Sequence, residues 1–119
     1  MRRVFMGIID GMKREHETLR RSDPRAMTPW ALFASPVVEA TAPDYRFWVS
    51  EREEMWLLKI RQKAAAGQYA DEAAFLGDVR RVRDNALAYN MPGHGRNGAP
   101  FVIPYAENMV LMAQRKLAE

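Results

Sequence analysis

Few side chains in this sequence could carry catalytic or metal chemistry. The 119 residues include no cysteine and only two histidines, His16 and His94. Without thiols the chain cannot form a disulfide, a thiolate metal cluster or a cysteine nucleophile, and two imidazoles argue against a multi-histidine metal centre. Neither a glycine-rich nucleotide loop nor a nucleophile–base set is visible. The residue types therefore favour a binding protein without a cofactor over an enzyme.

Two polar side chains stand out because each interrupts an apolar context at a turn of the chain. Asn90 follows a helical apolar pattern just before Pro92 and Gly93. Tyr45 lies in a proline-rich segment that is too apolar to be a flexible linker. The asparagine NH₂ and the tyrosine hydroxyl are both hydrogen-bond donors. Each residue also has a structural interpretation, Asn90 as a helix-terminal asparagine and Tyr45 as an amphipathic loop anchor.

The elements that must position these residues are helical. Apolar residues recur at helical spacing in four segments, and no convincing strand pattern is present. Ser50 with Glu53 predicts a capping box at the start of the second helix, Asp71 caps the third, and Pro104 suits the first turn of the fourth. The predicted helices cover residues 3–21, 51–66, 71–90 and 103–117. The fold class is therefore all-α, a four-helix bundle.

Two connections are unusual, a long loop over residues 22–50 and a glycine-rich loop over 91–102. The long loop contains four prolines and many large apolar residues, so it is neither one regular element nor a polar linker. Ordered apolar loops of this length are usually functional. With 48% hydrophobic and 28% charged residues, the composition is that of a globular protein, and the length predicts one domain over residues 1–119.

Charge is distributed unevenly along the chain, although the formal net charge is only +3. Residues 1–25 carry seven Arg or Lys against four Asp or Glu, and residues 55–83 carry six against three. Between them, residues 39–54 carry two Arg against five Asp or Glu. A duplex-binding face normally concentrates positive charge along one element. The interrupting acidic stretch therefore weakens a nucleic-acid interpretation without excluding it.

Several short motifs follow one another at family-like spacing between residues 33 and 93. They are Phe33-x-x-Pro36-Val37, Pro43-Asp44-Tyr45, Gly67-Gln68-Tyr69, Phe75-x-x-Asp78-Val79, Asn85-Ala86 and Tyr89-Asn90-x-Pro92-Gly93. In this order they resemble the bromodomain family, four-helix modules that recognise acetylated lysine. The resemblance implies a left-handed four-helix bundle with a long loop between its first and second helices. It also implies a non-catalytic reader that needs no cofactor.

The same resemblance assigns site residues. Asn90 would donate its NH₂ to the acetyl carbonyl, and Tyr45 would reach that carbonyl through a bridging water. The other implied residues line the apolar slot or gate it: Phe33, Val37, Tyr89, and Val102 as gatekeeper with Phe101 as the rival. Two motifs depart from the family. The Trp-Pro-Phe shelf reads Ala31-Leu32-Phe33, and Pro-Met-Asp-Leu reads Glu54-Met55-Trp56-Leu57.

The implied partner is an acetylated histone or another acetylated protein tail, in the nucleus and in chromatin-linked transcription regulation. No membrane partner is expected, because no run approaches the ~20 apolar residues that cross a bilayer. Two alternatives stay open. The chain could be a degenerate bromodomain that acts as a protein-interaction scaffold. It could also be a basic helical domain that binds nucleic acid through residues 2–25 and 59–83, and nucleic acid is in any case a secondary partner.

Overall fold

Six helices and no strands make up the computed structural model, which describes residues 1–119. They are α1 (Arg2–Ser22), α2 (Pro29–Phe33), α3 (Tyr45–Trp48), α4 (Leu57–Ala65), α5 (Glu72–Asn90) and α6 (Val102–Ala118). Four are the long helices expected from the apolar periodicity. The two short helices, α2 and α3, lie within the proline-rich connection over residues 22–50. None of the six has both the length and the apolar character that a bilayer crossing requires.

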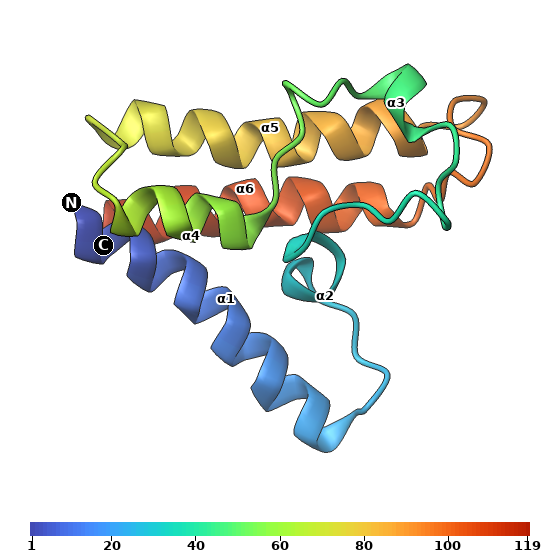
Figure 1. The fold of residues 1–119 in the computed structure, drawn as a ribbon. Coiled ribbons are helices and arrows are strands. Elements are labelled where there is room, and N and C mark those ends of the chain that lie inside the picture. Colours follow the sequence, from blue (N-terminus) through green and yellow to red (C-terminus); the bar gives the residue numbers. More distant parts are fainter.

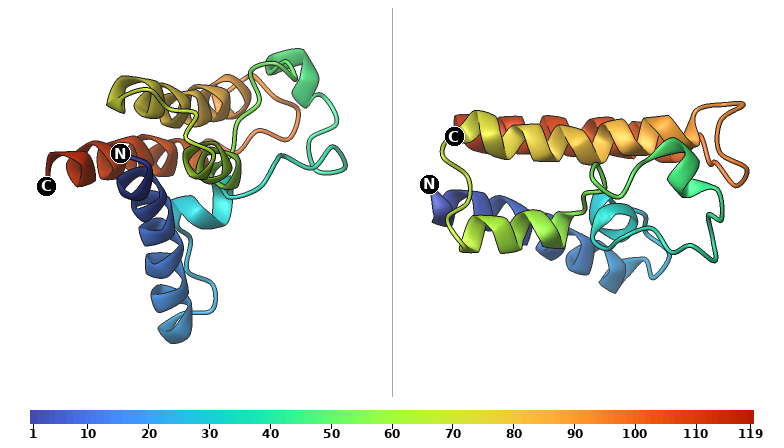
Figure 2. Two further views of the ribbon diagram at one scale, coloured as in Figure 1. Left: turned by 60° about the vertical axis from the view of Figure 1, so that its left-hand side comes forward. Right: turned by 45° about the horizontal axis from the view of Figure 1, so that its top comes forward.

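The long helices form a bundle in which α1 is the outlier (Figure 1). Helices α5 and α6 pack along their length, and α4 packs against α5. Helix α1 packs on α4 near its own N-terminus and then diverges from the bundle. Both chain termini lie at one end, whereas the α2–α3 connection and the loop between α5 and α6 lie together at the other (Figure 2). Two loops from distant parts of the sequence therefore meet.

Burial of the predicted apolar stripes holds the bundle together. At the terminal end the ring of Phe5 from α1 stacks on Phe75 from α5, with centroids 4.4 Å apart, and Tyr69 meets both rings edge-on. Each such buried aromatic contributes roughly 1.5–3 kcal/mol. The apolar residues of α5 that recur at spacings of three and four form a stripe that is buried throughout, namely Phe75, Val79, Val82, Ala86 and Tyr89. The stripe therefore fixes which side of α5 faces the core.

Several helix ends follow the local signals in the sequence. The Asp71 side chain accepts a hydrogen bond from the amide of Ala74 at 2.8 Å, which caps α5. In the same way Thr28 accepts from Ala31 and caps the short α2. Gly67 adopts φ +70° just after α4, the left-handed conformation that ends many helices. These three ends are set by local chemistry and not by tertiary packing.

The predicted start of the second long helix at residue 51 is wrong, because α4 begins at Leu57. The Ser50 carbonyl accepts the amides of Glu53 and Glu54, so residues 50–54 form a turn. The Ser50 hydroxyl donates to the Glu53 carboxylate at 3.0 Å instead of capping a helix. The Nδ2 of Asn85 donates a hydrogen bond to the Glu53 carbonyl oxygen at 2.7 Å. The Glu53 carbonyl is therefore bonded to Asn85 and not to an amide four residues further on, as it would be in a helix.

Candidate functional site

A cavity of about 240 Å³ opens at the loop end of the bundle, between the α2–α3 connection and the start of the α5–α6 loop. Six of the seven predicted site residues line it: Phe33, Val37, Tyr45, Tyr89, Asn90 and Val102. Phe101 does not line it and is 57% exposed. A larger groove of about 460 Å³ lies between α1 and α6, but fewer of its lining residues are apolar. The smaller cavity is the candidate site, because polar groups converge there on apolar walls.

Asn90 is the last residue of α5, and two protein contacts orient its amide. Its Nδ2 donates to the Ala86 carbonyl at 2.9 Å, and its Oδ1 accepts from the backbone amide of Ala99 at 2.8 Å. An asparagine NH₂ has two donors, so one N–H remains free while the other holds the side chain in place. The side chain is therefore a pre-oriented donor on the cavity wall.

The glycine-rich loop lies directly against this part of α5. A Cβ added to Gly98 would come within 2.7 Å of the Tyr89 carbonyl oxygen, and one added to Gly95 within 2.5 Å of the Tyr89 ring. Only residues without a side chain allow the loop to approach this closely. This approach brings the Ala99 amide within hydrogen-bonding reach of Asn90.

Asp44 ties the same loop to the long connection. Its carboxylate accepts from the Tyr89 hydroxyl at 2.7 Å and from the Arg96 amide at 2.8 Å. The Tyr89 hydroxyl bond, followed by that amide bond, lowers the pKa of Asp44 below its usual range. The Tyr89 hydroxyl is thus occupied within the protein, and its ring serves as a wall. Asp44 is not among the predicted site residues, and its position beside Tyr45 was the available signal in the sequence.

Tyr45 is 8% exposed, and its ring lies 5.4 Å from that of Tyr89. Its hydroxyl has no hydrogen-bond partner within the protein, yet it is not sealed off from solvent. Burial raises the pKa of Tyr45 to about 12, and the negative charge of Glu54 adds to the increase. The hydroxyl is therefore protonated at neutral pH and free to bond a water or a ligand.

Glu54 is a pocket residue that the sequence analysis missed. It is only 9% exposed, lines the cavity, and forms an ion pair with Arg46 of α3. The sequence analysis placed it at the helix start, where it replaces the first residue of the Pro-Met-Asp-Leu motif. No pattern signalled that the turn at residues 50–54 carries it inward. The cavity thus contains a carboxylate whose charge is balanced by one arginine.

Further apolar side chains, none of them among the predicted site residues, complete the walls. Those contributed by the connection and by α5 are Leu32, Ala42, Met55, Val82 and Ala86. Val82 and Ala86 belong to the predicted α5 stripe, so periodicity could have identified them. Leu32 occupies the altered shelf position, whereas Trp30 packs beside the core and does not line the cavity. The shelf is therefore aliphatic at this position.

Comparison with known proteins identifies the class. A family model described as bromodomain matches residues 17–96, well over half of the chain. The chain therefore belongs to the bromodomain family, a family of acetyl-lysine reader modules that are generally non-catalytic. The match includes the cavity residues from Phe33 to Asn90 and ends before Val102.

Individual relatives are similar over part of their length. The chain is 34% identical over 95 residues to transcription initiation factor TFIID subunit 1 of Oryza sativa subsp. japonica, covering 80% of this chain and 5% of that protein. It is 32% identical over 74 residues to bromodomain-containing protein 9 of Homo sapiens and of Mus musculus, covering 62% of this chain and 11% of those proteins. The chain thus spans only a small part of each relative.

The bromodomain of human BAZ1A has the same fold, with a TM-score of 0.67 over 98% of this chain and 94% of that one. The two sequences are 17% identical, so this likeness concerns the fold alone. The architecture is therefore a left-handed four-helix bundle of the bromodomain type, as the motif order predicted.

Proposed function

We propose that this domain binds acetylated lysine in protein tails, and in histone tails in particular, through the cavity at the loop end of the bundle. The supporting observation is the state of Asn90. Its amide is oriented by Ala86 and Ala99 and keeps one N–H free beside apolar walls. A single fixed donor in an apolar slot suits a ligand with an apolar stem and one carbonyl oxygen.

Acetylation is what makes a lysine fit this slot. An unmodified ammonium group would have to leave water for a largely apolar cavity, which costs several kcal/mol unless a counter-charge is provided. Glu54 does not provide one, because it is already paired with Arg46. The acetamide is neutral, so it needs only a partner for its carbonyl. Asn90 would donate to that oxygen directly, and the free Tyr45 hydroxyl would reach it through a water.

The surroundings of the slot suit a basic tail. Residues 39–54, which border the cavity, carry two Arg against five Asp or Glu. An acetylated tail remains cationic at its other lysines and arginines, so this acidic rim would steer it towards the slot. A histone tail fits that chemistry and would place the protein in the nucleus. Its role would then be non-catalytic, in chromatin-linked transcription regulation.

A second candidate function is that of a protein-interaction scaffold with little affinity for acetyl-lysine. The observation in its favour is the altered wall, with Leu32 in the shelf and the Glu54 carboxylate inside the cavity. Against it stand Tyr45 and Asn90, both of which line the cavity with a hydrogen-bonding group available.

Substitution of Asn90 tests the proposal. Asn90→Ala removes the donor proposed to bond the acetyl carbonyl directly, and losing that partner in a largely apolar slot costs about 1–3 kcal/mol, or roughly 5- to 150-fold in affinity. Asn108→Ala is the matched control, because Asn108 is exposed on α6 and does not line the cavity. Calorimetry with an acetylated histone peptide should show weak binding for Asn90→Ala and parental binding for Asn108→Ala. Equal affinities for the two variants, both folded by their melting transitions, would reject the proposal.

A further inference from the structure

The second half of α1 projects from the bundle without being part of the core. Its buried residues all precede residue 13, and almost every position from there to residue 25 is exposed. In Figure 1 this half of the helix points away from α4, α5 and α6. Its one side-chain hydrogen bond to the rest of the protein joins His16 to Thr28, with the His16 Nδ1 2.9 Å from the Thr28 hydroxyl. The segment is thus available to a partner.

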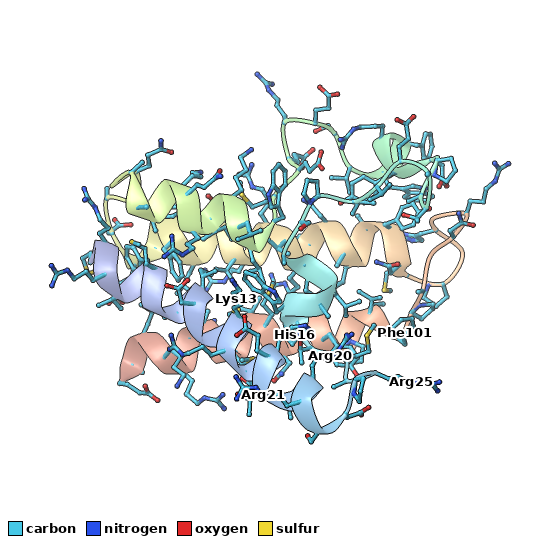
Figure 3. All side chains as sticks on the ribbon, turned by 60° about the horizontal axis from the view of Figure 1, so that its bottom comes forward. Lys13, His16, Arg20, Arg21, Arg25 and Phe101 are labelled. Carbon is cyan, nitrogen blue, oxygen red and sulfur yellow. The ribbon has the colours of Figure 1, made fainter.

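The projecting segment contains six basic side chains and three carboxylates, Glu15, Glu17 and Asp23. Five of the six basic side chains, all but Arg14, are labelled together on one side of the molecule in Figure 3. They form what we call the α1 basic face: Lys13, His16, Arg20, Arg21 and Arg25. Arg20 and Arg21 lie in the last helical turn, where cations also complement the helix dipole. That effect gives no reason for Lys13 and Arg25, which lie outside the last turn. The face therefore extends beyond what helix capping requires.

Ion pairing distinguishes this face from the other basic segment of the sequence. Four of the six cations in residues 55–83 are paired with carboxylates: Arg61 with Asp10, Lys63 and Arg81 with Asp78, and Arg83 with Asp84. On the α1 basic face only Lys13 has a partner, Glu17 at 3.9 Å. Asp10 of α1 is itself paired with Arg61, so it does not neutralise a cation of the α1 basic face. More unpaired cations therefore lie on the α1 basic face, namely Arg20, Arg21 and Arg25, than in residues 55–83, where Lys59 and Arg80 remain.

We propose that the α1 basic face binds the phosphate backbone of duplex nucleic acid, independently of the acetyl-lysine pocket. Lys13 and Arg20 are seven residues apart, about 10 Å along the helix axis. A duplex carries a charge every ~1.7 Å of its axis, so such a row meets several phosphates. Protein interfaces are instead built around apolar or aromatic anchors, whereas this face is mainly cationic, with Glu17 paired to Lys13 and Leu19 as the one exposed large apolar side chain of the segment.

The distribution of charge keeps the two sites separate. The acidic stretch over residues 39–54 borders the pocket and repels phosphate, whereas the α1 basic face attracts it. A nucleic-acid duplex would therefore lie along α1 and leave the pocket mouth open for a basic tail. Both partners could bind at once, each directed by charge of the opposite sign.

The test is the salt dependence of binding to a fluorescent duplex of about 20 base pairs, followed by anisotropy. With four phosphate contacts the logarithm of the binding constant should fall with a slope near −3.6, about a 150-fold loss between ~50 and ~200 mM salt. The triple variant Arg20→Gln, Arg21→Gln and Arg25→Gln should lower the slope to about −1. The matched control, Lys59→Gln, Arg81→Gln and Arg83→Gln, removes the same charge and should keep the parental slope.

Three results would overturn the inference. They are no binding by the parent at ~50 mM salt, equal losses in the two triple variants, and displacement of the duplex by polyglutamate at equal charge concentration. The last result would indicate an acidic protein as the partner. Failure here is distinguishable from failure of the pocket, because Asn90→Ala should keep duplex binding, and the arginine variant should keep its affinity for an acetylated peptide.

Discussion

Replacing Gly98 by alanine should damage the site through the loop that fixes Asn90. The added Cβ would lie 2.7 Å from the Tyr89 carbonyl oxygen and 3.1 Å from the Gly95 carbonyl oxygen. Both are backbone atoms, so no side chain can move aside, and the loop itself has to shift. Overpacking of this kind costs about 1–3 kcal/mol of stability. The shift also stretches the 2.8 Å bond from the Ala99 amide to Asn90.

Losing that bond should weaken acetyl-peptide binding about fivefold, since one neutral hydrogen bond contributes about 1 kcal/mol. Gly77→Ala is the control, because it makes the same chemical change at an exposed position of α5 where an added Cβ meets nothing within 4 Å. It should raise stability by about 0.5–1 kcal/mol and leave binding unchanged. Denaturant melts and calorimetry measure both effects. If Gly98→Ala matches the parent in both, the loop does not hold Asn90.

Three further outcomes are expected. Val102 lines the cavity, whereas Phe101 is 57% exposed outside it. Val102→Ala should therefore weaken binding about fivefold through lost apolar contact, and Phe101→Ala should change the dissociation constant by less than about twofold. The reverse order in calorimetry would make Phe101 the gatekeeper. Burial raises the pKa of Tyr45 from its ordinary value of 10.0 to about 12, so the stability gained by keeping the hydroxyl protonated is present below pH 10 and lost as the pH rises to about 12. Denaturant melts of Tyr45→Phe should therefore show a smaller loss over that range than melts of the parent, and parallel losses would refute this. Finally, Glu39→Gln with Glu51→Gln should flatten the salt dependence of peptide association in stopped flow, since exposed rim charges act on the encounter; an unchanged slope would exclude an acidic rim.

Local patterns in the sequence were sufficient to predict most of the bundle. The stripe that includes Phe75 and Val79 is buried as expected, and the observed bounds of α1, α5 and α6 lie within one residue of the predicted ones. The reason is that helical periodicity and end signals such as Asp71 are encoded within a few residues. The family could be identified from the order of the motifs, because the spacing between them reflects the lengths of both loops as well as of the helices.

Only the site residues that the family motifs assign could be predicted from the sequence. Asn90 and Tyr45 lie at the cavity as expected, but Asp44 and Glu54 owe their roles to partners about 45 and 8 residues away. The second helix starts late, and the Glu53 carbonyl before it is bonded to Asn85, more than thirty residues downstream. Such hydrogen bonds depend on how the loops meet at the open end of the bundle, and a single sequence contains no local signal for them.

The most direct test of the central claim compares one peptide with and without its acetyl group. Calorimetric titration of the domain with an acetylated histone tail peptide and its unmodified twin isolates the single change that the pocket is proposed to read. We expect measurable binding of the acetylated peptide and at least about tenfold weaker binding of the unmodified one, because a buried ammonium would lack a free counter-charge. Equal affinity for the two peptides, or binding of neither, would contradict acetyl-lysine recognition by this cavity.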